Sequence, residues 1–193
     1  MTETEARDIL DLETIHPDIE SILVARSLIG ATVAKTAQEI DRRYAGKKLL
    51  LAGVLKGSFI YLSDLVRSIT IPHEISFLQA SSYGGGTESS GNVRINVDLT
   101  SGDLSDTHIL LAEDIVDSGN TLQAVMEYFR GKNALSVSFC TLLDKPERRK
   151  VPVYTDFPTI VIPDEFVVGY GLDFAEKYRY LPYIGILRRS VYE

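Results

Sequence analysis

The segment 109–122 contains the residues best suited to chemistry. Glu113 and Asp114 directly follow an apolar run. Two apolar residues then separate these acids from a small polar cluster, which consists of Asp117, Ser118, Gly119, Asn120 and Thr121. Small residues that lead into a helix can direct several backbone N–H groups at one anion, and the hydroxyl groups of Ser118 and Thr121 would add donors. This half of the segment predicts a phosphate site.

The two acids point to a different partner. The carboxylates of Glu113 and Asp114 would repel the same phosphate, so we expect them to accept hydrogen bonds from hydroxyl groups such as those of a ribose. Neighbours in a regular strand point to opposite faces, so the two acids can share a ligand only where the strand has begun to turn. This places Ile115 and Val116 past the sheet edge. The plainer alternative is that Asp117 and Ser118 only cap the following helix.

Hydrophobic periodicity predicts the elements that position this segment. Helical spacing of apolar residues predicts helices at 18–44, 58–69 and 121–130. Apolar runs predict strands at 49–55, 75–81, 93–97, 109–112 and 135–143, and short extended pieces between prolines at 159–162, 166–169 and 184–187. Strands that alternate with helices predict an α/β fold, an open and mostly parallel twisted sheet flanked by helices, with ligands at the carboxyl ends of the strands.

Composition limits the possible partners. The chain has 193 residues, a net charge of −7 and a pI near 5.0, so we expect one domain and no nucleic-acid partner. No apolar run is long enough to span a membrane, and the acidic segment 1–12 lacks the apolar core of a signal peptide, which predicts a cytoplasmic protein without membrane contact. Cys140 is the single cysteine, and its apolar neighbours favour a buried, unreactive thiol.

The acidic segment and the polar cluster together resemble the signature with which type I phosphoribosyltransferases bind phosphoribosyl pyrophosphate (PRPP). The resemblance extends over nearly the whole chain and is similar to the hypoxanthine-guanine branch of that family. It implies that Glu113 and Asp114 hold the ribose, that residues 117–121 hold its phosphate, and that Asp117 takes a proton from N7 of the purine. It also makes Glu113 and Asp114 candidate metal ligands.

Two further segments resemble the family's pyrophosphate-binding parts. In residues 54–59, the peptide bond between Lys56 and Gly57 can be cis in the family, with its backbone facing pyrophosphate. Ser82 and Tyr83 resemble the start of a loop that closes over the reaction centre, and the glycine-rich composition of 82–92 predicts mobility. Without the resemblance, Lys56 would be a surface lysine and 82–92 an ordinary surface loop.

The base is expected to bind further along the chain. Residues 141–146 resemble the loop whose lysine, here Lys145, contacts the purine, although a surface lysine is the plainer alternative. Residues 163–173 resemble the purine-binding segment, in which Phe166 stacks on the base and the backbone at Val167 reads its edge. The resemblance further implies that Asp173 lies beside the base and binds Mg²⁺ directly or through water, and that Arg179 reaches the pyrophosphate.

The resemblance implies a Mg²⁺-dependent transfer of the phosphoribosyl group from PRPP to hypoxanthine and guanine, by a homodimer or homotetramer. Its alternatives are a xanthine, adenine or orotate transferase, or a PRPP-sensing regulator of the same fold, against which the acidic pI counts. We expect a single domain over 1–193 with its core at about 46–145. The N-terminal helix and the C-terminal segment, about 1–30 and 150–193, are expected to form a small hood over the base.

Overall fold

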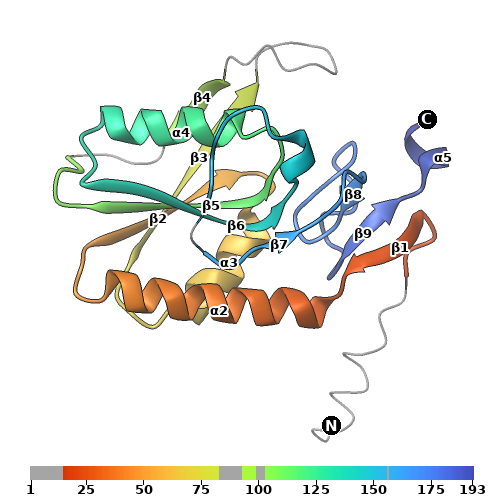
Figure 1. Cartoon of the computed structure of the whole chain (residues 1–193), viewed down its shortest axis with the longest axis horizontal. Helices are drawn as coiled ribbons and strands as arrows, with labels where there is room; N and C mark the ends of the chain where they lie inside the picture. Colours follow the sequence, from red (N-terminus) through yellow and green to blue (C-terminus); the bar gives the residue numbers. More distant parts are fainter. Residues whose placement is uncertain (1–14, 83–92, 99–102, 156) are drawn as a thin grey trace, which may run out of the picture.

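The computed structural model describes residues 15–82, 93–98, 103–155 and 157–193, which form two sheets and their helices (Figure 1). The strands are β1 Ile19–Val24, β2 Leu49–Leu55, β3 Glu74–Ser82, β4 Val93–Asp98, β5 His108–Val116, β6 Ser136–Asp144, β7 Ile160–Val161, β8 Val167–Val168 and β9 Ile184–Leu187. The helices are α2 Arg26–Tyr44, α3 Phe59–Ser68, α4 Asn120–Gly131, α5 Arg189–Tyr192 and the 3₁₀ turn η1 Pro146–Arg148.

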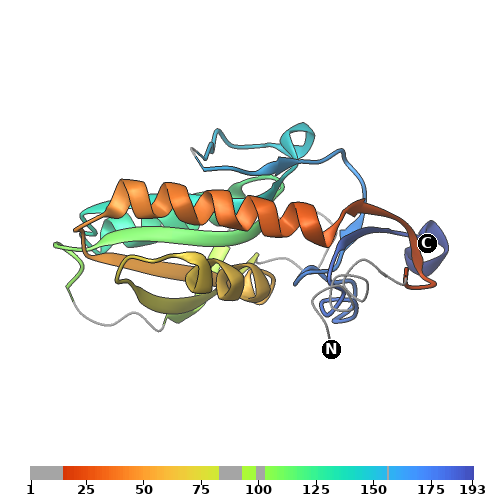
Figure 2. The same cartoon turned by 90° about the horizontal axis from the view of Figure 1, so that it is seen from below.

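The larger sheet has six strands in the order β4-β3-β2-β5-β6-β7. All of its neighbouring pairs are parallel except β3 and β4, so β4 is an antiparallel edge strand. Helix α4 packs on one face, while α2 and α3 pack on the other, as the two views show (Figures 1 and 2). Residues 49–54 of β2 are all buried because both faces are covered, which explains its unbroken apolar run.

These elements confirm the predicted fold class and most of the predicted strands and helices. The carboxyl ends of β2, β5 and β6 lie at the same edge of the sheet because the three strands are parallel neighbours. That edge is where an open α/β sheet binds its ligands. None of the helices in the described part of the chain combines the length and apolar character needed to span a bilayer. Cys140 is fully buried in β6, and burial raises the pKa of its thiol to about 12.

The prediction of one helix over 18–44 is wrong in its first part. Residues 19–24 form β1, which pairs antiparallel with β9, and Ala25 in extended conformation separates that strand from α2. Apolar side chains at Ile19 and Ile22 fit helical spacing as well as they fit a strand. The partner that decides the matter, β9, lies about 160 residues further along the chain, where local periodicity gives no information.

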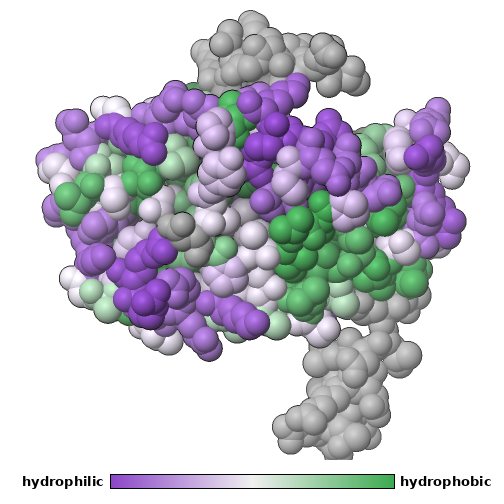
Figure 3. Space-filling view, viewed as in Figure 1, coloured by the Kyte–Doolittle hydropathy of each residue, from purple (hydrophilic) through white to green (hydrophobic). Residues whose placement is uncertain are grey.

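The smaller sheet has the order β1-β9-β8 and lies beside the carboxyl edge of the larger sheet (Figure 1). We call this sheet, with the segment between β8 and β9, the hood. Its N-terminal contribution is a strand and not the expected helix, whereas β7 belongs to the larger sheet. On the face in Figure 3, apolar surface gathers over the region of this sheet and the start of α2, and the rest is mostly polar.

Strand β5 also runs further than expected. The prediction that Ile115 and Val116 lie past the sheet edge is wrong, because they pair with Leu143 and Asp144 of β6. Pairing with β2 nevertheless ends at Ala112, directly before the two acids. The edge is therefore staggered: β5 and β6 continue beyond β2. Glu113 and Asp114 consequently lie where one side of β5 has already lost its neighbour.

Candidate active site

The polar cluster after β5 forms a loop that enters α4. Gly119 is the residue before the helix and has a left-handed φ of 86°. A Cβ atom at Gly119 would collide with the side chains of Val151 and Val153, so both the conformation and the space favour glycine. The N-cap residue Gly119 has no side chain to cap α4, but Oγ of Ser118 accepts a hydrogen bond of 3.4 Å from the N–H of Asn120, so Ser118 supports the start of the helix as the plainer alternative expected.

A small cavity lies in this loop, with a volume of about 90 Å³. It is lined by Glu113, Ile115, Val116, Asp117, Ser118, Gly119, Thr121 and Leu122. The segment after η1 supports the loop from behind, since the backbone N–H groups of Lys150 and Val151 donate to the Ser118 carbonyl at 2.9 and 3.3 Å. The structure thus brings most of the predicted phosphate-binding residues to one cavity at the start of a helix, where an anion is favoured.

The two acids are held in an environment that disfavours their charge. Glu113 is only 8% exposed, and burial, with the nearby Asp114, raises its pKa well above the usual value. Burial also raises the pKa of Asp114 to about 6, although the N–H of Ile115 donates to its Oδ1 at 2.9 Å. Hydroxyl donors or a cation would stabilise the ionised forms of both groups.

Three loops meet at Asp114. Gly57, after β2, packs so tightly on the Asp114 carboxylate that a Cβ atom would overlap it, and Gly171 packs in the same way on the Gly57 carbonyl. The cis peptide bond in this loop joins Leu55 and Lys56, so the expectation for Lys56–Gly57 is wrong by one residue. The sequence predicts a loop after β2, but which of its peptide bonds is cis depends on how the loop packs against the rest of the chain.

The predicted pyrophosphate residues occupy the rim of this junction. Lys56 forms an exposed ion pair with Glu176 at 3.1 Å. Arg179 is mostly buried, donates to the Gly171 carbonyl at 2.6 Å and pairs with Asp173 at 2.8 Å. Ser82 is the last residue of β3, and its side chain is not among those described; Tyr83 and the rest of the segment to 92 lie outside the described residues.

The expected base-binding residues Lys145, Phe166 and Val167 lie directly after β6 and at the start of β8. Lys145 is only 7% exposed, and its Nζ donates to the Glu165 carbonyl, so the surface-lysine alternative is wrong. Burial lowers the pKa of Lys145, while Asp117 and Asp164 act in the opposite direction. Phe166 is 40% exposed, and Val167 is buried in β8. A buried ammonium next to an exposed aromatic ring is suited to a flat ligand with a hydrogen-bond acceptor.

Arg148 is a site residue that the sequence analysis missed. Its Nε lies 3.0 Å from Oδ1 of Asp117, and its Nη1 lies 3.3 Å from Oδ1 of Asp164. It therefore joins residues 117–121, the predicted phosphate-binding loop (called the phosphate loop below), to the segment that precedes Phe166. Its position three residues after Lys145 was the available signal, but a lone arginine in a charged stretch is usually a solvated residue.

Arg149 was missed as well. Its guanidinium pairs with the Asp144 carboxylate at the end of β6 and donates to the Val153 carbonyl at 2.9 Å. These bonds hold the segment that packs behind Gly119. Arg149 thus supports the phosphate loop from outside the cavity.

A family model described as the phosphoribosyl transferase domain matches residues 21–175. That range includes β5, the phosphate loop and the segment of Lys145 and Phe166. The chain belongs to the phosphoribosyltransferase family.

Several named members of this family are close to the chain. It is 45% identical over 178 residues to the hypoxanthine-guanine phosphoribosyltransferase of Streptococcus pneumoniae, which covers 92% of this chain and 98% of that protein. It is also 45% identical over 166 residues to the hypoxanthine phosphoribosyltransferase of Salmonella typhimurium, covering 85% and 93% of the two chains.

A solved structure shows the same fold. The crystal structure of a hypoxanthine phosphoribosyltransferase from Staphylococcus aureus has a TM-score of 0.88 and 40% identity, over 95% of this chain and all of that one. The fold of this phosphoribosyltransferase is thus the type I fold, with a mostly parallel sheet and helices on both faces.

The acidic residues fit a magnesium ion that arrives with a phosphate ligand. Within the described ranges, no group of three or more His, Cys, Asp or Glu side chains is arranged to hold a metal by itself. Mg²⁺ is commonly bound by one or two carboxylates together with substrate phosphates. Burial is the main cause of the raised pKa of Asp114; Arg179 lowers this pKa and its ion-pair partner Asp173 raises it, so the three charged groups lie close together. A cation near the two carboxylates would favour their ionised forms.

Proposed function

We propose that this phosphoribosyltransferase transfers the 5-phosphoribosyl group of PRPP to hypoxanthine and guanine, which yields IMP or GMP and pyrophosphate. The relative from Streptococcus pneumoniae carries both bases in its name, and the relative from Salmonella typhimurium carries hypoxanthine. The proposal would place this protein in purine salvage.

The buried ammonium of Lys145 is the observation that carries the substrate assignment. Its Nζ lies against the Glu165 carbonyl, directly before Phe166, and it has donors but no acceptor. The 6-oxo group of hypoxanthine or guanine accepts a hydrogen bond from such a group. Adenine presents an amino donor at that position, so its binding would leave buried donors facing each other. A site of this kind can reject the wrong analogue by about 10⁴–10⁵-fold.

The remaining residues divide the reaction between them. Residues 118–121 would bind the 5′-phosphate, and Glu113 and Asp114 would accept hydrogen bonds from the ribose hydroxyls. Lys56, Gly57, Ser82, Tyr83 and Arg179 would hold the pyrophosphate. The bond from the anomeric carbon to pyrophosphate breaks, and the bond to N9 of the purine forms. Asp117 would take the proton that leaves N7.

Phe166 would stack on the base, and the backbone at Val167 would read its edge. Asp173, beside the base, would also hold Mg²⁺ directly or through water, with Glu113 and Asp114 as further candidate ligands. When bound, Mg²⁺ neutralises charge on the pyrophosphate leaving group. Among these three acids, Asp173 and Asp114 fit the ion best, because Glu113 is the most deeply buried.

Assembly, location and domain organisation complete the proposal. We expect a homodimer or homotetramer in the cytoplasm, with neither a membrane nor nucleic acid as a partner. We also expect one domain over 1–193, with the core at about 46–145 and the hood from both terminal segments. Light scattering on the purified protein measures the oligomer.

Steady-state assays with free bases test the function. The purified protein is mixed with Mg-PRPP and hypoxanthine, guanine, xanthine, adenine or orotate in turn, and nucleotide formation is measured. We expect turnover with hypoxanthine and guanine and none above background with adenine or orotate. Higher kcat/KM for xanthine than for hypoxanthine would contradict the assignment of the base. Absence of turnover with every base, combined with tight PRPP binding, would favour a PRPP-sensing regulator.

A further inference from the structure

Three aromatic rings form a cluster at the hood: Phe166 directly before β8, Phe174 between β8 and β9, and Tyr192 in α5. The rings of Phe166 and Tyr192 are stacked, with centroids 4.8 Å apart and planes at 22°. Phe174 meets both rings edge-on, at 5.7 Å from Phe166 and 6.3 Å from Tyr192. Stacked and edge-to-face pairs are the two favourable arrangements of aromatic rings. Tyr192 thus covers one face of Phe166, the ring to which purine stacking is assigned above.

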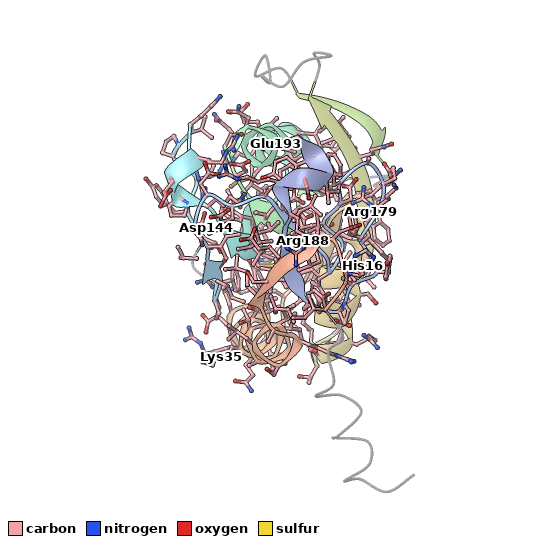
Figure 4. All side chains as sticks on the ribbon, turned by 90° about the vertical axis from the view of Figure 1, so that its right-hand side faces the viewer. His16, Lys35, Asp144, Arg179, Arg188 and Glu193 are labelled. Carbon is pink, nitrogen blue, oxygen red and sulfur yellow. The ribbon has the colours of Figure 1, made fainter. Side chains whose placement is uncertain are left out.

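The backbone fixes the position of Tyr192 relative to Phe166. The N–H of Leu187, at the end of β9, donates to the Phe166 carbonyl at 2.9 Å. Arg188 then ties the following turn to the start of β1, because its N–H donates to the Asp18 carbonyl and its Nε to the Pro17 carbonyl, both at 2.9 Å. Figure 4 looks at this end of the molecule and shows Arg188 against the β1 ribbon. Tyr192 therefore follows a backbone segment, Leu187 and Arg188, that is hydrogen-bonded to Phe166 on one side and to the start of β1 on the other.

Phe166 needs such support. It is 40% exposed, so its ring is not enclosed by the core, and an aromatic side chain in that situation can change rotamer. A base that stacks on a ring with several orientations must first select one of them, which weakens its apparent affinity. Stacking by Tyr192 on one face and contact with Phe174 restrict the ring, and 40% of the surface of Phe166 remains exposed for a ligand.

We propose that Tyr192 is a positioning residue for the purine: it backs the Phe166 ring and holds it in the plane on which the base stacks. The inference rests on the proposed function, because it requires that Phe166 binds the base. It predicts an effect on the base and not on PRPP, since the phosphate loop and the Gly57 junction lie on other elements. A ring is required at position 192, whereas the hydroxyl group is not.

The test compares Tyr192→Phe, Tyr192→Leu and Tyr192→Ala in the full chain, with KM for hypoxanthine and for PRPP measured separately. Tyr154→Ala is the control, since Tyr154 is 83% exposed and lies outside the ring cluster. We expect Tyr192→Phe to keep wild-type constants. Tyr192→Ala and Tyr192→Leu should raise KM for hypoxanthine about tenfold, which is the size of one stacked aromatic contact, while KM for PRPP changes less than about twofold.

Three results would overturn the inference while leaving the proposed function intact. An unchanged KM for hypoxanthine in the alanine and leucine variants would show that Phe166 needs no support. A lower KM would show that Tyr192 covers the stacking face. An equal rise in both KM values would indicate general loss of structure. If the wild-type protein does not turn over any base, the proposed function fails first, and the inference fails with it.

Discussion

The phosphate loop and the hood are built in different ways. Residues 113–121 are continuous in sequence and run from the end of β5 into the first residues of α4, and the cavity is lined by residues of this segment and by Leu122. The hood joins β1, β8 and β9, and the paired residues of β1 and β9 are at least 160 residues apart, as Val24 and Ile184 show. One half of the proposed site is therefore local in the sequence, and the other half is assembled by long-range pairing.

This difference suggests how the two halves can change. A local loop keeps its geometry as long as its own residues and immediate supports remain. The base-binding side of the proposed site is assembled from distant strands, so a change in any of those strands changes its shape. Its preference for one base can therefore change while binding of the phosphoribosyl donor stays the same. Arg148 joins the halves, since it contacts Asp117 in the loop and Asp164 before the hood. The following predictions test how separate the halves are.

The largest effect is expected at Asp117. Asp117→Asn keeps the shape of the side chain but removes the proton acceptor, so kcat should fall by about 10²–10⁴-fold while PRPP binding stays near wild type. Isothermal titration with Mg-PRPP and steady-state rates give the two quantities. Asp103→Asn is the matched control, because Asp103 is an exposed carboxylate that accepts hydrogen bonds from the N–H and Oγ of Ser105, before the amino end of β5. A loss of kcat below about threefold would reassign Asp117 to a purely structural role.

The second largest effect is expected at Lys145, and it should change the kinetic constants for hypoxanthine but not the KM for PRPP. Lys145→Ala removes a charged donor from a buried position, which commonly changes free energy by about 1.5–3 kcal/mol. We expect kcat/KM for hypoxanthine to fall by about 10–150-fold, with part of the loss in kcat, and KM for PRPP to stay within about twofold. Lys35→Ala, at an exposed position on α2, is the control. Near-normal hypoxanthine kinetics and unchanged rejection of adenine would move base selection to the backbone at Val167.

The pH dependence of the free energy of unfolding tests the segment that contains Asp114. Burial raises the pKa of Asp114 from 3.8 to about 6 in the folded protein. The folded state then holds more protons than the unfolded state between these values, so the free energy of unfolding should fall as pH rises from about 4 to 6. The contribution is at most about 2–3 kcal/mol by the shift in pKa.

The burial of Glu113 acts in the same direction. Urea titrations across this pH range, without ligand, measure the slope for the wild type and for Asp114→Asn. A flatter slope in the variant is expected. An identical slope in the wild type and in Asp114→Asn would show that other groups cause the pH dependence.

The smallest effect is expected at the link between the halves. The pair of Arg148 and Asp117 is about half exposed on both sides, and exposed pairs contribute roughly 0.2–1 kcal/mol. Because Arg148 engages the carboxylate that should receive the base proton, Arg148→Ala should lower KM for hypoxanthine by up to about fivefold. Arg130→Ala, at an exposed position on α4, is the control. A rise in KM would indicate that Arg148 contacts the base or the leaving group.

Much of the local half followed from the sequence. The acids after an apolar run and the Asp-Ser-Gly-Asn-Thr cluster predicted a strand, a loop and a helix, and all three are present. Phosphate binding by that loop stays a prediction. Adjacent residues determine this geometry: a left-handed glycine, small side chains and a helix start within a few positions. Resemblance then supplied roles for Lys145 and Phe166 that composition could not have assigned.

Only the tertiary structure decided the features that depend on distant partners. Residues 19–24 are a strand because β9 pairs with them, and Ile115 and Val116 stay in the sheet because β6 extends beyond β2. The Arg148 link to Asp117 and the stack of Tyr192 on Phe166 likewise join segments that are separate in sequence. Periodicity reports which faces are apolar, whereas the identity of the group that covers each face is set by packing across the whole chain. The sequence alone thus determined which polar residues follow β5, whereas the tertiary structure determined which distant segments lie next to them.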